Sequence, residues 1–511
     1  MRQGFRQSMA WLHTWSGLVV GWVLFAIFVT GTASYYRTEI SRWMRPELTA
    51  ATADPARSAD MAAAYLKRQM PDAAGWYVEL PRPETPLIEV HWWKSLEGPF
   101  HNALLDPATG APSTARATKG GDFLYRFHFE LGMPPTVGRW IVGLCALVLL
   151  VSLMSGIVTH RRIFADFFTF RRGARTTQRR WLDAHNVVGV LALPFHLMIV
   201  YTGLVTLAPM LMPWGLVAAY RAEAPRFYVE AGLMADMRAP AGRPGTLAPL
   251  GPMVAQAIAR QGEAPEAFAV YNPGDAAATA VATFEEPHGL AHQHPQITFD
   301  GETGAILGTA GMAPTRAAST TSTVMVGIHE AHFAGSALRL LFVLCGVMGA
   351  ATVGTGLVLW GVARAPKGAE PAGLGLRLVR ILNLGTIAGL PLGIAAFFLA
   401  NRLLPPDLPA RADWEIRIFF GAWALAALAG ALRPQDRAWR EGLGLAALAY
   451  LAVPLVGLAT VGRSPVPAFD IAMVAVALLF GCAAYKAGRS PLGARAARPA
   501  QDLSGEEALR A

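Results

Sequence analysis

The sequence has only three cysteines, and none of them belongs to a recognisable cysteine motif. Cys145, Cys345 and Cys482 each lie in an apolar stretch, and neither CxxC nor CxxCH occurs. These absences exclude a disulfide framework, a zinc or thioredoxin-type CxxC site and covalently attached c-type haem. GxGxxG is also absent, and we find no flavin- or nicotinamide-binding domain, so an electron donor would have to be external.

Charge is scarce as well. Charged residues make up 15% of the 511 residues and hydrophobic residues 53%, which is too apolar for an ordinary soluble protein. Apolar segments of about 20 residues are typical of membrane-spanning helices. We predict eight spans, at residues 14–36, 138–159, 186–208, 339–361, 381–401, 415–432, 442–462 and 466–485. The first is long and no small-residue cleavage site follows it, so we interpret it as a retained span rather than a signal peptide.

The net charge of +9 follows the predicted spans rather than forming one nucleic-acid-binding face. Basic residues gather at the N-terminus and in residues 161–185, 361–380, 433–440 and 486–511. All five segments fall on one side if the chain crosses the membrane eight times, and short basic loops stay in the cytoplasm. We therefore predict a multi-pass protein of the bacterial inner membrane with both termini in the cytoplasm and no role in nucleic-acid binding.

This topology leaves two large segments outside, residues 37–137 and 209–338, each long enough for a small domain. The other predicted parts are TM1 (1–36), TM2 (138–160), a basic cytoplasmic loop (161–185), TM3 (186–208), TM4 (339–361), an appended four-helix membrane bundle (381–485) and a cytoplasmic tail (486–511).

The part of the chain before the appended bundle repeats itself. "WLHTWSGLVVGWVLFAIFVTG", from Trp11, resembles "WLDAHNVVGVLALPFHLMIVYTG", from Trp181. Residues of the second span recur in the fourth: Arg139 as Arg339, Cys145 as Cys345, and Gly156 as Gly356. The outer segments share "DPATG" and "DGETG", in which an Asp and a later Gly suit a β-turn between strands. We predict two parallel copies of helix, outer β-containing domain and helix.

Seven of the 12 histidines lie in or beside the first four predicted spans. They are His13, His160 and His185 at the cytoplasmic ends, His196 deeper in the third span, and His128, His329 and His332 on the outside. Along one continuous helix, His185 and His196 would lie about 16 Å apart and would serve different centres. Imidazoles grouped at two depths suit b-type haems, which need no motif beyond their ligands.

Other chemistries remain open for these histidines. "HEAH" (329–332) could hold a metal from one helical face, although zinc sites usually form a tighter cluster. "HGLAHQH" (288–294) could bind a metal or contact an iron-bearing ligand through His292 and His294, although solvated loop histidines are the simpler explanation. A proton relay is the weaker alternative, because the first four predicted spans have none of the acidic residues that transporters usually carry.

The segments "LHTWSGL", "HRRIFADFFTFRRG", "LDAHNVVGVLALPFH" and "TGLVLW" resemble the PepSY-associated transmembrane family over about residues 5–365. The "DPATG" and "DGETG" turns look like the hairpins of its PepSY-like outer domains. Closest in character are the iron-regulated, FoxB-type inner-membrane haemoproteins that reduce ferric siderophores. The resemblance implies an α-helical polytopic membrane protein with two α+β PepSY-like periplasmic domains on an internally duplicated four-helix core.

By the same resemblance, the helices hold two b-type haems and pass electrons to a ferric siderophore or other ferric chelate in the periplasm, which releases iron(II) for uptake. The donor would be quinol, reduced flavin or a cytoplasmic reductase. The inner-haem ligand candidates are His13, His160 and His185. The outer-haem candidates are His196 with His128, His329 or His332. Two rivals stay open: a non-enzymatic PepSY protein that binds or regulates a periplasmic partner such as a peptidase, and a metal or siderophore permease.

Overall fold

The computed structural model describes residues 4–48, 53–95, 101–160, 176–221, 223–287, 289–312, 316–366 and 373–489. Most of the predicted basic loop (161–175), most of the predicted tail (490–511) and His288 lie outside these described residues. The chain divides into two compact units. The first unit is Met1–Val29, Met154–Leu191 and Met348–Ala511, and the second unit is Thr30–Leu153 and Ala192–Val347.

Within the described ranges, eight helical segments are long and apolar enough to cross a membrane. They are Phe5–Ser34 (α1), Pro135–Thr159 (α5), Leu193–Leu211 (α7), Ser336–Ala363 (α12), Leu374–Leu403, Arg411–Leu432 (α15), Gln435–Val461 (α16) and Pro467–Gly488 within α17 (Pro467–Arg489). The segment Leu374–Leu403 consists of α13 (Leu374–Leu384), a π-helical turn (Gly385–Gly389) and α14 (Leu390–Leu403). The protein is therefore a multi-pass membrane protein, as the apolar segments predicted.

The third predicted span, residues 186–208, is not one continuous helix. It is split between α6 (Thr177–Leu191) and α7, with Ala192 outside both helices. Pro194 in the first turn of α7 explains the break, because its ring has no N–H to donate and disfavours helical geometry in the residue before it. The spacing predicted for His185 and His196 assumed a continuous helix, which the structure does not have. α6 also begins inside the segment predicted as the basic loop.

The second unit contains one antiparallel sheet of seven strands, in the order β3-β2-β1-β4-β5-β6-β7. The strands are β1 (Gly75–Glu79), β2 (Ile88–Trp93), β3 (His101–Leu105), β4 (Ala267–Tyr271), β5 (Thr279–Thr283), β6 (Gln296–Asp300) and β7 (Ile306–Ala310). The first three come from segment 37–137 and the others from 209–338, and β1 pairs with β4 along its whole length. The two outer segments were predicted to form separate domains, but they share this sheet.

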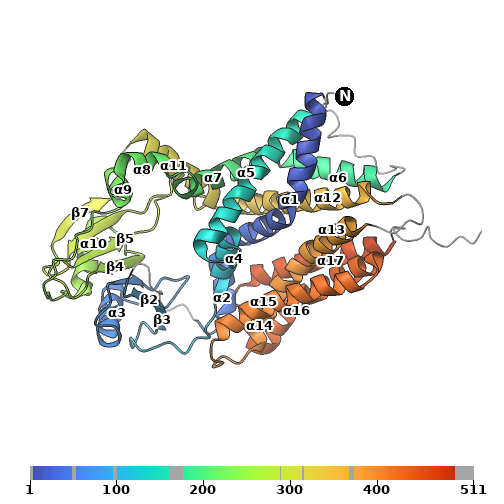
Figure 1. Ribbon diagram of the computed structural model, residues 1–511. Helices are drawn as coiled ribbons and strands as arrows, with labels where there is room; N and C mark the ends of the chain where they lie inside the picture. Colours follow the sequence, from blue (N-terminus) through green and yellow to red (C-terminus); the bar gives the residue numbers. More distant parts are fainter. Residues whose placement is uncertain are drawn as a thin grey trace, which may run out of the picture. The chain divides into compact units, whose positions relative to one another are not determined.

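Two amphipathic helices, α3 (Pro55–Gln69) and α10 (Leu250–Gln261), lie side by side against this sheet (Figure 1). Asp54 begins α3 by accepting a hydrogen bond from the amide of Ala56. The core between helices and sheet contains the buried rings of Trp76, Phe268 and Phe299. Burial of such a ring contributes roughly 1.5–3 kcal/mol. The common core therefore holds the strands of both outer segments together.

The two predicted β-turns are present. Asp106 Oδ1 accepts hydrogen bonds from the amides of Ala108 and Thr109, and Gly110 has a φ of 69°. The second turn repeats the arrangement between β6 and β7, where Asp300 Oδ1 accepts from the amides at 302 and 303 and Gly304 has a φ of 72°. The short Asp side chain replaces the missing backbone partner, and glycine tolerates the positive φ.

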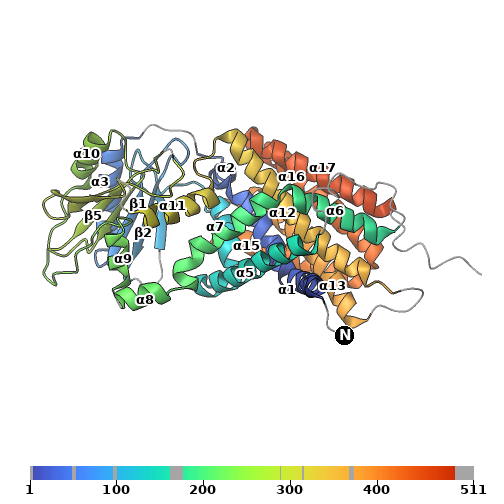
Figure 2. The ribbon, with the colours of Figure 1, turned by 90° about the horizontal axis from the view of Figure 1, so that it is seen from above.

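The remaining helices of the second unit are short: α2 (Arg37–Met44), α4 (Gly120–Glu130), α8 (Trp214–Tyr220), α9 (Ala224–Glu230) and α11 (Ala317–Glu330). In the first unit, α14 to α17 form the appended bundle (Figure 1), and Figure 2 shows α16 and α17 side by side. A buried ion pair between Arg411 and Glu415 lies at the start of α15, and Asn401 of α14 donates to the same carboxylate at 2.8 Å. These contacts compensate the two charges locally and tie α15 to the end of α14.

Candidate functional site

Two histidines face each other in the first unit. His13 on α1 and His185 on α6 have ring centroids 6.2 Å apart, with the ring planes inclined by 60°. His185 Nδ1 lies 2.9 Å from the carbonyl oxygen of Thr352 and 3.3 Å from the hydroxyl of Thr355, both on α12. The Thr355 hydroxyl donates its own hydrogen to the Ala351 carbonyl, so its oxygen is an acceptor for Nδ1–H. These contacts fix Nδ1 as the protonated nitrogen and leave the Nε2 lone pair for another ligand.

A second pair has the same construction in the second unit. His128 on α4 and His329 on α11 have ring centroids 6.1 Å apart, at 31°. His329 Nδ1 lies 3.0 Å from the carbonyl oxygen of Ile199 and 3.1 Å from the hydroxyl of Thr202, both on α7. Thr202 likewise donates its hydrogen to a carbonyl of its own helix, that of Met198. The carbonyl and the hydroxyl come from positions i and i+3 of one helix, as at His185.

Each of the four rings also packs against a glycine of a spanning helix. A Cβ on Gly156 would lie 3.1 Å from His13, and one on Gly356 would lie 3.2 Å from His185. The contacts are closer in the second unit, where a Cβ on Gly31 would lie 2.5 Å from His128 and one on Gly203 would lie 2.8 Å from His329. At Gly31 and Gly203, only glycine leaves room for the imidazole in its present position, whereas at Gly156 and Gly356 an added Cβ would require a small shift of the ring.

All four histidines are ligand candidates in the sequence, but the groups that surround them were not predicted. Each of the first four spanning helices carries a hydroxyl residue directly before the glycine that touches a ring: Thr30-Gly31, Ser155-Gly156, Thr202-Gly203 and Thr355-Gly356. This dipeptide recurs in all four spans and could have directed attention to these positions, although α1 carries a second one, Ser16-Gly17, that touches no ring. Glycine alone carried no such information, because it is frequent in packed spanning helices in general.

The paired rings fit a b-type haem with one imidazole on each side of the iron. A first-row metal binds imidazole nitrogen at about 2 Å, and that nitrogen lies roughly 1 Å from its ring centroid, so the two centroids should be about 6 Å apart. The observed separations are 6.2 and 6.1 Å. One ring of each pair is held through Nδ1, as is usual for metal-ligating histidines. The ring separations and the Nδ1 contacts are those that such a cofactor would need.

Two further ligand candidates belong to neither ring pair. His196 is buried, and its Nε2 lies 3.4 Å from the carbonyl oxygen of Cys345, so its ring is held by the opposite nitrogen. His160 follows the last residue of α5, and its amide bonds to the carbonyl of Gly156 at 3.2 Å. The Nδ1 atom of His160 is buried and has no hydrogen-bond partner among the described residues.

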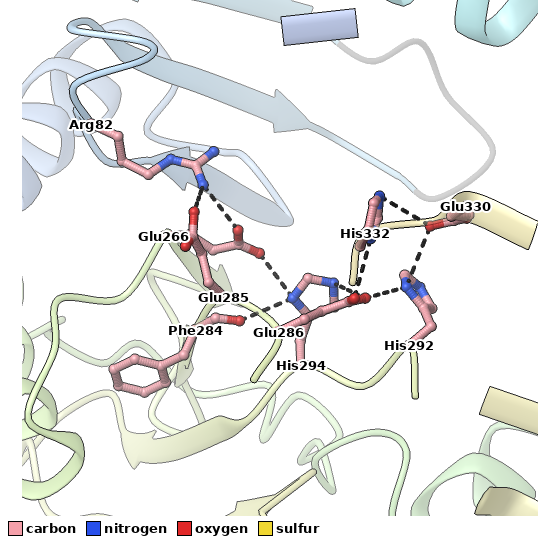
Figure 3. Close-up of polar contacts among 9 residues, drawn as sticks. All are labelled: Arg82, Glu266, Phe284, Glu285, Glu286, His292, His294, Glu330 and His332. Carbon is pink, nitrogen blue, oxygen red and sulfur yellow. Dashed lines mark hydrogen bonds and ion pairs between the residues drawn. The ribbon is translucent and has the colours of Figure 1, made fainter. Parts of the chain in front are cut away.

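The other candidate histidines form a third group, in the loop between β5 and β6 and at the end of α11 (Figure 3). Glu286 is at its centre: Oε2 lies 3.2 Å from His332 Nδ1, while Oε1 contacts His292 Nδ1 and lies 3.4 Å from His294 Nε2. Glu330 Oε2 lies 3.4 Å from His292 Nδ1 and 3.5 Å from His332 Nε2. We call Glu286, His292, Glu330 and His332 the Glu286 cluster.

The charges around Glu286 favour its ionised form. Burial by itself raises the pKa of this carboxyl group, but its contacts with His292 and His332 lower the pKa to about 2. His294 has a different partner: its hydrogen bond to Glu266 raises its pKa to about 9, so it carries a positive charge at neutral pH. His294 is therefore a counter-ion beside the cluster rather than a metal ligand.

The fold and the histidine pairs define a class of multi-pass membrane protein. Along the chain, the strands of its sheet lie between successive spanning helices. Residues 10–362 match the model of the PepSY-associated TM region, and the chain belongs to this family. The chain is also similar to the uncharacterized protein PA4219 of Pseudomonas aeruginosa, with 28% identity over 406 residues that cover 74% of this chain and 96% of that protein. The family match includes all four paired histidines and ends before α13.

Proposed function

We propose that this protein is a transmembrane electron carrier that holds two b-type haems and reduces a ferric chelate outside the cytoplasm. The observation that carries the proposal is the repeated histidine pair, built from different helices in each unit. A structural role for a single histidine would require neither an imidazole opposite it nor a glycine against each ring. Two such pairs, matched in centroid separation and in the groups that hold Nδ1, support two equivalent cofactor sites.

In this proposal, His13 and His185 hold one haem, and His128 and His329 hold the other. The i and i+3 groups of α12 and α7 keep one ring of each pair in the tautomer that ligates through Nε2. When bound, each haem would supply a one-electron iron(II)/iron(III) couple. His160 and His196, which belong to neither ring pair, are not assigned as haem ligands.

The chemistry of the substrate follows from this one-electron couple. Each ferric ion takes up one electron, so a two-electron donor such as quinol would serve two ferric ions. Quinol, reduced flavin or a cytoplasmic reductase could act as the donor. Ferric siderophores and related chelates are suitable acceptors, because such ligands hold iron(III) far more tightly than iron(II). Reduction would therefore release iron(II) for uptake, as in the FoxB-type reductases that the sequence resembles.

The proposal is tested with the purified full-length protein. We expect a reduced-minus-oxidised spectrum of the b type and two haems per chain by the pyridine haemochrome method. In liposomes with a reductant inside, we expect an iron(II) indicator outside to report one iron(II) per electron supplied. Folded protein without haem would contradict the proposal and favour the partner-binding alternative. Net passage of intact chelate without iron(II) formation would favour the permease.

A further inference from the structure

The Glu286 cluster has the composition of a metal site, and it is separate from the two histidine pairs. We propose that Glu286, His292 and His332 bind one divalent first-row transition-metal ion, with Glu330 as an additional carboxylate. This metal-site proposal rests on the function proposed above and extends it, because the site would receive the iron(II) that leaves the chelate. Two imidazoles and one carboxylate with open positions form a ligand set that suits iron(II), and zinc(II) accepts the same atoms.

The geometry is close to what a bound ion requires. One ligand atom from each of Glu286, His292 and His332 lies within 4.8 Å of the other two. Ligands about 2 Å from one metal lie roughly 3–4 Å from each other, so small rotations of the side chains would complete the site. His332 is the most exposed member, with 53% of its side chain accessible, which gives an ion access to the group.

The polar contacts within the cluster are incomplete without a cation. Glu286 Oε1 and His292 Nδ1 are buried, and neither has a hydrogen bond of ordinary geometry to any described residue, although the two atoms are in contact. Buried polar atoms that point at each other without such a bond are costly unless another group satisfies both. A metal ion would accept a lone pair from each atom and remove the conflict.

Charge in the cluster also points to a cation. Across the described ranges, no lysine or arginine forms an ion pair with Glu286 or Glu330, whose partners are all histidines. Arg82 is nearby in Figure 3 but pairs with Glu266 and Glu285 instead. Neutral His292 and His332, as metal ligands must be, leave Glu330 without a cationic partner and Glu286 with His294 alone, which Glu266 also binds. A divalent ion would balance the remaining negative charge.

The corresponding position in the first half of the core shows the contrast. Glu130 precedes Arg139 by the same interval at which Glu330 precedes Arg339, and each glutamate is the last residue of a short helix. Glu130 forms ion pairs with Arg126 and Arg139. Its counterpart faces His292 and His332 instead. The arginine-compensated carboxylate has no need of a metal, so we assign the metal site to the second half alone.

The proposal is tested by metal binding to the full-length protein, stripped with a chelator and dialysed anaerobically against iron(II) or zinc(II) alone. We expect about one ion per chain beyond haem iron, counted by elemental analysis. The isosteric variant Glu286→Gln and the double variant Glu286→Gln/His292→Ala should bind the ion at least about tenfold more weakly. The matched control is His91→Ala, because His91 also contacts two glutamates, Glu79 and Glu89, but lies on β2 outside the cluster.

Haem content is measured on every variant and separates the possible results. Retention of the ion by the double variant, or no ion in the parent protein, would overturn the metal site. Loss of a haem in His332→Ala with the ion retained would overturn it too, because His332 would then be a haem ligand. The assay needs no ferric chelate, so a parent that binds the ion but holds no haem would refute the electron-carrier function and leave the metal site standing.

Discussion

His329 and His332 are three residues apart, yet their surroundings are opposite. His329 faces another imidazole, a glycine, a carbonyl and a hydroxyl, and burial lowers its pKa to about 3. His332 faces Glu286 and Glu330, and its hydrogen bond to Glu286 raises its pKa. Ala331 separates them with a φ of 58°, a left-handed residue that ends α11 and reverses the chain.

This contrast shows how one short stretch can supply two kinds of ligand. An imidazole kept neutral and held through Nδ1 leaves the lone pair of Nε2 for a metal such as haem iron. An imidazole among carboxylates shares a negative site that attracts cations. The "HEAH" sequence alone could not separate these roles, because both histidines precede the same span. What distinguishes them is the identity of the groups that α7 and the β5–β6 region place against them.

The largest expected effect comes from removing one histidine of the His128–His329 pair. We expect His329→Ala to lower the haem content from two to one per chain and to reduce ferric-chelate turnover more than about 100-fold, since even loss of a group that merely orients a ligand costs about 10–100-fold. His332→Ala is the matched control and should keep both haems. Pyridine haemochrome assays would decide, and an equal haem loss in both variants would erase the distinction between the two histidines.

The glycines allow the two histidine pairs to be compared with each other. We expect Gly203→Ala to disturb haem binding more than Gly356→Ala, because the added Cβ would lie 2.8 Å from His329 but 3.2 Å from His185. The first distance forces a shift of the ring, whereas the second needs only a small adjustment. Gly421→Ala, with nothing within 4 Å, is the control on a spanning helix. A larger haem loss at Gly356 than at Gly203 would refute this order.

Glu130 and Glu330, each the last residue of a short helix, should differ in what they stabilise. We expect Glu130→Gln to reduce the free energy of unfolding by about 1 kcal/mol, because it weakens ion pairs with half-exposed Arg126 and Arg139. Glu330→Gln should leave the thermal unfolding temperature of the metal-free protein nearly unchanged but weaken binding of added iron(II). Thermal unfolding in detergent, followed with and without metal, measures both. If added iron(II) changed the unfolding temperature of Glu130→Gln as little as that of Glu330→Gln, the assignment of Glu330 to the metal site would be contradicted.

Much of this architecture could be predicted from local sequence. Apolar length located the spans, and the Asp and Gly of "DPATG" predicted the turn at Asp106. The single sheet could not be predicted, because pairing of β1 with β4 depends on two exposed strand edges that meet only in the folded chain. The same holds for the partner of His329: its closest imidazole, on α4, is distant in sequence, and no local pattern links the two residues.

The smallest expected effect concerns the threonines that hold the ligand histidines. Thr202→Val and Thr355→Val each remove a hydroxyl acceptor from Nδ1 but keep the shape of the side chain and the backbone carbonyl of Ile199 or Thr352. Because the carbonyl still fixes the tautomer, we expect both haems to be retained and the reduction potential of one haem in each variant to shift, with haem affinity changed less than about tenfold. Spectroelectrochemical titration would show which haem responds in each variant. Since the two hydroxyls occupy equivalent positions on α7 and α12, the shifts should have the same sign, and shifts of opposite sign would show that the two pairs are alike in geometry but not in electrostatics.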